Sequence, residues 1–153
     1  MAKDELILGP DPFLIEGALP PDRVSTVLTR WSADARVGGV ASFAGLVRAD
    51  ETPEGPVSAI EFTAHRSMAE RSIRELAERA AAAYDSPVLR VHVEHALGRV
   101  PVGGIPIVIV AGASHRAEAF GLCRDILEAL KAEVPIYGRE LTEGGGRQWK
   151  VNR

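Results

Sequence analysis

Hydrophobic residues recur along this chain with two different spacings, which predict helices in some segments and strands in others. Three segments place them three or four positions apart, the spacing of a helix that buries one face. The inward faces of the three predicted helices are Val24, Val27, Leu28 and Trp31; then Ile73, Leu76, Ala77, Ala80 and Tyr84; then Ala119, Leu122, Cys123, Ile126, Leu127 and Leu130. Ser67 and Glu70 have the spacing of a capping box at the start of the second helix, and Pro135 ends the third near residue 133.

Strands are predicted where β-branched and small apolar residues dominate or alternate with polar ones. They cover residues 6–8, 13–15, 37–47, 57–64, 88–96, 105–111, 136–141 and 148–151. The segment 57–64 alternates and should have one solvated face, whereas 105–111 is apolar throughout and should be buried on both faces. Strands mixed with helices, without a regular strand–helix–strand alternation, predict an α+β domain.

Two further segments are predicted to be turns or loops. Residues 49–56, ADETPEGP, contain acidic residues, proline and glycine, which is typical of a mobile loop. Because this loop follows Arg48 directly, it is a candidate lid over a site at that residue. A turn is expected around residues 98–104, before a strand that holds Pro106 near its start.

Composition places the chain among ordinary globular proteins. Its 153 residues predict one domain, 1–153, and 46% hydrophobic and 25% charged residues are average values. A formal net charge of −3 offers no general attraction to the phosphates of nucleic acid. The longest uncharged stretch, residues 100–114, is too short for a membrane span and is broken by prolines and glycines. One cysteine, and acidic residues where a secretory signal would be apolar, predict a cytoplasmic protein.

Several common chemistries find no support in the residue spacing. His92 and His95 are three apart on a predicted strand and so point to opposite faces, and His65 and His115 have no ligand partner nearby, which argues against a metal site. Cys123 lies on the apolar stripe of a helix, where a buried, inert thiol is expected. The chain has no glycine-rich phosphate loop and no dinucleotide fingerprint, so we predict neither a metal nor a cofactor.

Five cationic side chains stand at the ends of predicted elements, where a scaffold presents groups to a ligand. They are Arg48, His115, Arg116, Lys131 and Arg139. Lysine occurs only at positions 3, 131 and 150, so generic surface charge is carried by arginine and a lysine at a site-like position stands out. For each of these residues a solvated surface charge is the alternative, and only a fold that brings them together would make a site.

Five short motifs occur in order between residues 37 and 149. They are Phe43-Ala-Gly-Leu-Val-Arg48, Ser67-Met-Ala-Glu70, Gly98 with Gly103, Ser114-His-Arg116 with Ala119-Phe120, and Leu130-Lys131 with Val134-Pro135 and Arg139-Glu140. In order and interval they resemble the large, catalytic subunit of molybdopterin synthase. The residues before 37 match this family more loosely.

The resemblance implies an α/β-hammerhead fold with an additional small antiparallel β subdomain. It also implies a homodimer at the centre of a heterotetramer, with a ubiquitin-like small subunit as the partner. In that family the small subunit ends in a Gly-Gly thiocarboxylate, which gives sulfur to cyclic pyranopterin monophosphate. Two such transfers form the dithiolene of molybdopterin in molybdenum cofactor biosynthesis, so the resemblance implies a sulfurtransferase.

The same resemblance implies roles for particular residues. Lys131 would be the catalytic lysine, and Arg48, His115 and Arg116 would hold the pterin and its phosphate. The whole substrate pocket would comprise Leu46, Val47, Arg48, His115, Arg116, Lys131, Gly138, Arg139 and Glu140, with Phe43 and Lys150 as additional candidates. Because both substrates are anions, a pocket of fixed cations suits them physically.

Three positions depart from the family pattern. A usual second lysine is Gly138, a usual glutamate is Thr63, and the arginine that usually follows His95 is Ala96. Losing the lysine removes one pocket cation, for which Lys150 is a candidate replacement. Two other hypotheses therefore stay open: a catalytically weak or inactive relative that acts as a binding module for the small subunit, and a structural or regulatory homodimer.

Overall fold

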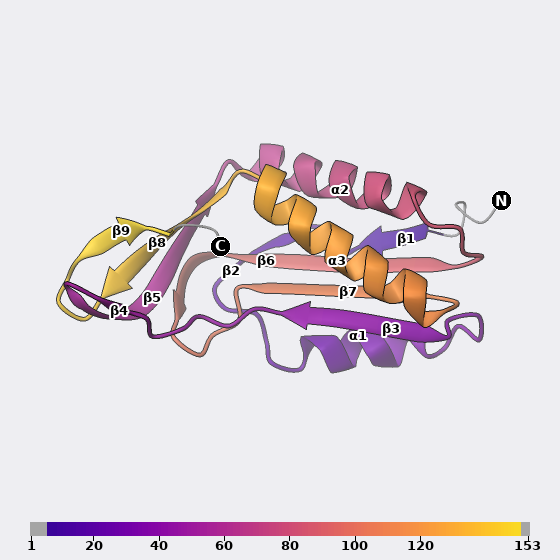
Figure 1. Cartoon of the computed structure of the whole chain (residues 1–153), viewed down its shortest axis with the longest axis horizontal. Coiled ribbons are helices and arrows are strands. Elements are labelled where there is room, and N and C mark those ends of the chain that lie inside the picture. The colour runs from indigo at the N-terminus through magenta and orange to yellow at the C-terminus, as the bar shows by residue number, and fades with distance from the viewer. Residues whose placement is uncertain (1–5, 151–153) are drawn as a thin grey trace.

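One long strand, β6 (Leu89–Pro101), runs through both parts of the structure and joins them (Figure 1). The computed structural model describes residues 6–150. β6 pairs antiparallel with β7 (Ile107–Ala113) over residues 89–95 and with β5 (Gly55–Ala64) over residues 98–101. Gly98 lies where the partner changes and has a φ of 84°, a conformation that favours glycine.

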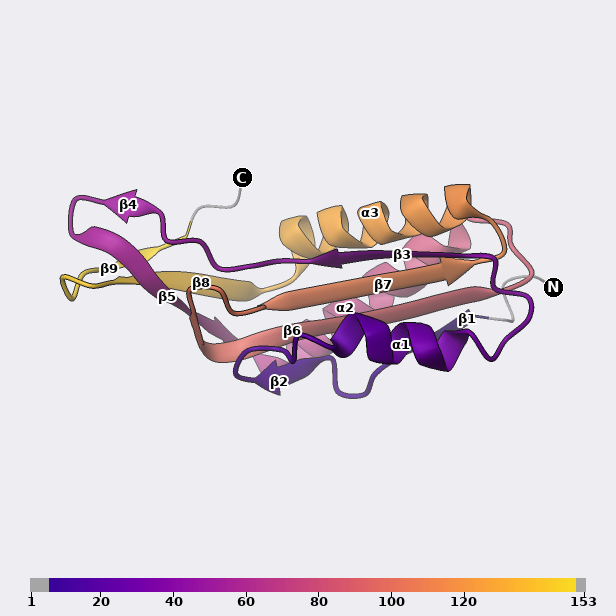
Figure 2. The ribbon, with the colours of Figure 1, turned by 90° about the horizontal axis from the view of Figure 1, so that it is seen from below.

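The larger part is a sheet covered by helices on both faces. Its strands are β3 (Gly39–Ala44), β7 and the first half of β6, with β1 (Leu6–Gly9) and β2 (Leu14–Glu16) parallel to β6. Figure 2 shows α2 (Arg66–Ala82) and α3 (Arg116–Glu133) on one side of this sheet and α1 (Arg23–Trp31) on the other. The three predicted helices are confirmed.

The smaller part is an antiparallel β subdomain at the left of Figure 1. It contains β4 (Glu51–Thr52), β5, β8 (Ile136–Thr142) and β9 (Arg147–Trp149), with β8 between β5 and β9. The predicted α+β class and the additional small subdomain are therefore confirmed. Within residues 6–150 no helix has the length and apolar character needed to cross a membrane.

Strand β7 lies at the centre of the core because both of its faces are covered. Val108 and Val110 pack with Val27 and Trp31 on the side of α1, whereas Ile109 belongs to the larger cluster on the side of α2 and α3. All seven residues of β7 are buried, which confirms the predicted burial for residues 107–111. The strand predicted over 105–111 begins two residues later, because Ile105 is half-buried and forms only an isolated bridge with Leu19. The helices contribute apolar stripes to the larger cluster, among them Ala69, Ile73, Leu76, Ala77, Ala119, Leu122, Cys123, Ile126 and Leu130.

The structure corrects several predicted boundaries. The strand predicted over 37–47 is only β3, and β6 continues to Pro101 through half of the turn predicted over 98–104. The segment 49–56, predicted to be a mobile loop, contains β4 and turns back into β5, with Glu51 paired to Pro56. On α1, Leu28 is 47% exposed and does not belong to the inward face. Residue 151, predicted in the last strand, lies outside the described residues.

The predicted capping box of α2 is wrong, because its carboxylate has a tertiary role. The N-cap is His65, whose Nδ1 accepts a hydrogen bond from the Met68 N–H at 3.4 Å. Glu70 accepts hydrogen bonds from the backbone N–H groups of Phe13, at 2.9 Å, and Leu14, at 2.8 Å. The carboxylate thus ties the start of β2 to the helix that covers it.

Replacing Glu70 should destabilise the fold. We expect Glu70→Ala to lower the free energy of unfolding by about 1–3 kcal/mol, since hydrogen bonds to charged groups are among the stronger ones and two backbone donors lose their acceptor. Urea denaturation followed by circular dichroism measures the change. Glu75→Ala, an exposed residue of the same helix, is the matched control and should change stability little. Equal effects of the two substitutions would contradict this role of Glu70.

Candidate active site

Two adjoining cavities lie where the larger part of the structure meets the β subdomain. The smaller, of about 160 Å³, is lined by Phe62, His95, Leu130, Lys131, Val134, Ile136, Tyr137, Gly138, Trp149 and Lys150. The larger, of about 520 Å³, is lined by Phe43, Ala44, Gly45, Leu46, Val47, Arg48, Ile60, Phe62, His95, Pro106, Ile107, Lys131 and Lys150. Phe62, His95, Lys131 and Lys150 border both, so the cavities form one space, which we call the Lys131 pocket.

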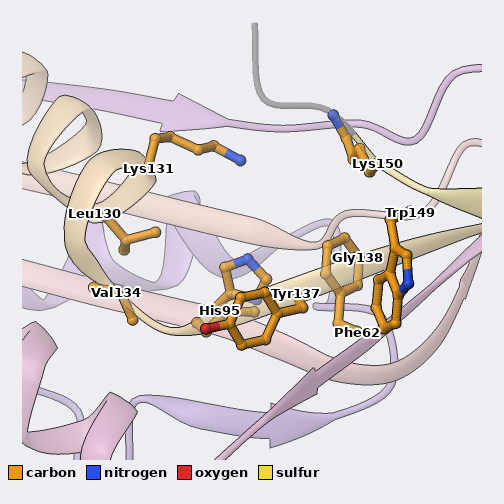
Figure 3. Close-up of a pocket in the computed structure, with 10 residues that line it drawn as sticks. Phe62, His95, Leu130, Lys131, Val134, Tyr137, Gly138, Trp149 and Lys150 are labelled. Carbon is orange, nitrogen blue, oxygen red and sulfur yellow. The ribbon is translucent and has the colours of Figure 1, made fainter.

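Lys131 stands in the last turn of α3, where the helix meets the pocket. Its neighbour Leu130 is buried and holds this turn against the core, and the Val134 N–H closes the helix by donating to the Leu130 carbonyl at 3.1 Å. Figure 3 shows the Lys131 amine extending over the cavity. Burial, and then the charge of Lys150, lower the pKa of Lys131 below its ordinary value of 10.5. This amine can therefore attract an anion and also give up a proton more readily than an exposed lysine.

His95 forms part of the wall of the pocket and is almost completely buried. Its Nδ1 lies 2.7 Å from the Ala96 carbonyl, which can only accept, so Nδ1 carries the proton. The ring packs edge-on against Phe62 with centroids 5.0 Å apart. Burial lowers the pKa of His95 to about 4, outweighing the opposing effect of the Ala96 carbonyl. At neutral pH the imidazole is therefore uncharged, and its Nε2 is an acceptor.

His95 was not among the site residues predicted from the sequence. Strand alternation placed it on the face opposite His92, and the structure agrees, because His92 Nε2 lies 2.6 Å from Glu94 Oε1 in a separate buried cluster. Alternation alone does not say which of the two faces borders a cavity. That information comes from distant elements, since Phe62 of β5 and Lys131 of α3 line the pocket together with His95.

The segment before β4 forms another wall of the pocket. Phe43, Leu46, Val47 and Arg48 all line the larger cavity. Val47 is buried and anchors the segment, whereas Leu46 is 63% exposed. Arg48 is exposed and pairs with Asp50 at 3.2 Å. Because exposed ion pairs contribute little free energy, an incoming anion can replace Asp50 as the partner of Arg48.

The residues at 138–140 divide between the pocket and its surroundings. Gly138 lines the smaller cavity, but Arg139 and Glu140 are not among the lining residues. Arg139 pairs with Glu61 on β5, and its guanidinium carbon lies 6.0 Å from the centre of the Trp149 ring. Glu140 accepts a hydrogen bond from Gln148 on β9 at 3.0 Å. These two charged residues link β8 to its neighbours β5 and β9.

His115 and Arg116 lie at the opposite end of α3 from Lys131. His115 is the N-cap of the helix and Arg116 its first residue, whereas Lys131 stands in the last turn. At 1.5 Å per residue, Arg116 and Lys131 are about 22 Å apart along the helix axis. A single chain therefore does not bring these predicted substrate-binding residues into one pocket.

Comparison with known proteins places this arrangement in a family. The family model described as MoaE protein matches residues 19–133. The chain belongs to the MoaE family. It is 34% identical over 116 residues to the molybdopterin synthase catalytic subunit of Nostoc sp., covering 76% of this chain and 69% of that protein. It is 35% identical to the rice (Oryza sativa subsp. indica) molybdopterin synthase catalytic subunit over 120 residues, which are 78% of this chain and 60% of the rice protein.

Solved structures with low sequence identity share the fold. Staphylococcus aureus molybdopterin synthase superposes with a TM-score of 0.80 at 19% identity, covering 94% of this chain and 99% of that chain. A complex of subunits 1 and 2 of the molybdopterin-converting factor from Helicobacter pylori gives a TM-score of 0.75 at 19% identity, covering 92% and 90%. The family and the role in molybdenum cofactor biosynthesis that the motifs predicted are thereby confirmed.

The buried, uncharged His95 makes stability depend on pH. In the unfolded chain this histidine takes up a proton near pH 6.5, but in the folded protein only near pH 4, so unfolding becomes easier as the pH falls through this window. Between pH 7 and 4, His95 should lower the free energy of unfolding by about 3 kcal/mol. We expect this part of the pH dependence to be absent in His95→Gln. Denaturant unfolding at a series of pH values measures it. An unchanged slope in His95→Gln would contradict the prediction.

Proposed function

We propose that this chain transfers sulfur from the C-terminal thiocarboxylate of a ubiquitin-like small subunit to cyclic pyranopterin monophosphate, producing the dithiolene of molybdopterin. The observation that carries the proposal is the Lys131 amine, which has a lowered pKa and borders both cavities at once. Family membership supports the chemistry, and the H. pylori structure of subunits 1 and 2 supports a small-subunit partner. The cytoplasmic location expected from the sequence stays a prediction.

The pocket suits two anions that must meet. A thiocarboxylate tail and a cyclic phosphate repel each other, and fixed cations between them offset that repulsion. Lys131 and Lys150 border both cavities and Arg48 borders the larger one, so positive charge surrounds the place where the substrates would come together. The apolar ring of Phe62 and the uncharged imidazole of His95 complete the wall and limit water there.

Each transfer makes and breaks a defined set of bonds. A bond forms between the tail's sulfur and a carbon of the pterin side chain while a carbon–oxygen bond at that same carbon breaks, and the departing oxygen takes up a proton. The bond between that sulfur and the tail's acyl carbon breaks next. Addition of water to the acyl carbon leaves a carboxylate on the small subunit. Lys131 is placed to stabilise the oxyanion that forms on the acyl group and to donate or accept a proton as sulfur leaves.

We propose further that a homodimer completes the site. His115 and Arg116 are at the wrong end of α3 to reach their own chain's Lys131, so their predicted role requires a second copy of the chain. Within residues 6–150, β3 pairs only with β7 and leaves its outer edge free for a partner. Phe43 on β3 is 36% exposed, and Phe120 on the neighbouring α3 is 67% exposed, as a pairing surface requires.

The comparisons do not favour the binding-module hypothesis, because the curated relatives are themselves named catalytic subunits. Gly138 had suggested that hypothesis, since it removes one lysine from the family pattern. The pocket nevertheless contains a second lysine, Lys150.

Removing the Lys131 amine should abolish turnover. We expect Lys131→Ala to reduce product formation at least ~100-fold, the scale measured when a group stabilising an oxyanion is lost. A single-turnover assay with the purified chain, thiocarboxylated small subunit and cyclic pyranopterin monophosphate measures it. Lys131→Arg keeps the charge and separates binding from proton transfer, and Arg124→Ala, exposed on the same helix, is the control. Full activity in Lys131→Ala would refute the proposal.

Mixed dimers test whether the site is shared between two copies. Lys131→Ala and Arg116→Ala chains with different affinity tags are co-expressed and the heterodimer is purified. If Arg116 acts across the dimer, one of the two pockets has both intact residues and the heterodimer regains activity that neither homodimer has. If Arg116 serves its own chain, both pockets of the heterodimer are defective. An inactive heterodimer would therefore refute the shared site without affecting the role of Lys131.

A further inference from the structure

We propose that Lys150 is the second cation of the Lys131 pocket, placed there by the pairing of β9 with β8 opposite Gly138. From the sequence, Lys150 was only a candidate replacement for the lysine missing at 138, because it follows a glycine-rich turn and belongs to none of the family motifs. The proposal deepens the proposed function, on which its catalytic part rests.

Strand register places Lys150 and Gly138 opposite each other. Arg139 pairs with Trp149 across the antiparallel ladder, and one position further the Lys150 N–H donates to the Gly138 carbonyl at 2.7 Å. Directly opposite residues of antiparallel strands project on the same face, with Cβ atoms about 4.5–5.5 Å apart. A side chain at 150 therefore leaves the sheet on the face where a side chain at 138 would.

The space over Gly138 is small, which explains why the longer side chain comes from the other strand. A Cβ built on Gly138 would lie 3.1 Å from Cγ2 of Ile60 and 3.2 Å from Cε1 of Phe62. Both neighbours are buried, so a larger residue at 138 would need them to shift. Glycine keeps these two side chains in place and leaves the approach to the pocket open for Lys150.

Contacts of the two residues before Lys150 hold β9 in this register. Trp149 lies beside the Arg139 guanidinium, and Gln148 donates to Glu140 at 3.0 Å. Figure 3 shows Lys131 entering the pocket from α3 and Lys150 from the end of β9, on either side of the cavity. The two amines thus come from different elements, the end of α3 and the end of β9, and together they bring two positive charges to the pocket.

The charge of Lys150 also affects the pKa of Lys131. Among residues 6–150, the other titratable side chains that line the two cavities around Lys131 are His95, Tyr137 and Arg48. The charge of Lys150 contributes, after burial, to the lowered pKa of Lys131. A bound anion between the amines would reduce their repulsion, so the pair should bind anions more strongly than either lysine alone.

Nuclear magnetic resonance of the lysine side chains tests the pair without requiring activity. The chain contains three lysines, at 3, 131 and 150, so the Lys131 signal can be assigned with single variants. We expect Lys150→Ala to raise the pKa of Lys131 toward its ordinary value and Lys150→Arg to leave it lowered. Arg147→Ala, at an exposed residue of β9 shortly before Lys150, is the matched control and should leave the pKa of Lys131 unchanged. A Lys131 pKa that is the same in Lys150→Ala and in the parent protein would overturn the proposal.

The single-turnover assay then tests the role in the reaction. We expect product formation to fall roughly tenfold or more in Lys150→Ala and to be largely restored in Lys150→Arg, because the charge and not the shape is required. An active parent protein with an equally active Lys150→Ala would overturn the catalytic part. If the pKa of Lys131 responds to Lys150 but the parent forms no product, the pair stands and the proposed sulfur transfer fails.

Discussion

The change of partner within β6 is the constraint on which the site depends. Up to His95 this strand belongs to the helix-covered sheet, and from Gly98 it pairs with β5 of the subdomain. The positive φ of Gly98 allows the chain to turn this corner, and a Cβ there would also approach the Glu16 carboxylate to 3.0 Å. The corner separates the two parts of the sheet enough for β8 and β9 to reach the C-terminal end of α3. The Lys131 pocket is the space left between them.

The electrostatics of this pocket follow from its burial. Burial disfavours the charged form of a side chain, so it lowers the pKa of His95 to about 4 and the imidazole is neutral at pH 7. Lys131 is in a more open position, and its pKa is lowered by burial and then by the like charge of Lys150. Without an anion the two amines repel each other, and this unfavourable interaction is relieved when an anion binds. On the proposed function, part of the affinity for the anionic substrates arises from relief of that repulsion.

The spacing of apolar residues along the chain predicted the helices and strands well, but it predicted their tertiary contacts poorly. The apolar spacing identified the three helices and the doubly buried strand β7, because those signals come from residues close in sequence. The capping box failed since Glu70 bonds to Phe13 and Leu14, more than fifty positions away. His95 was missed for the same reason, because only the packing of distant elements decides which strand face borders a cavity. The separation of Arg116 from Lys131, by contrast, follows from helix length alone and was open to prediction once α3 was recognised.

Gly138 and Lys150 illustrate that a positive charge needed in a pocket can be supplied from more than one sequence position. Two opposite residues of an antiparallel pair present their side chains to the same space, so either strand can supply a group to it. Here the tight packing of Ile60 and Phe62 leaves little room for a side chain at 138, whereas β9 brings Lys150 over the same face. In the sequence, glycine at 138 means that one lysine of the family pattern is absent. On the proposal made for Lys150, the opposite position of the neighbouring strand supplies this positive charge, so the pocket still contains it.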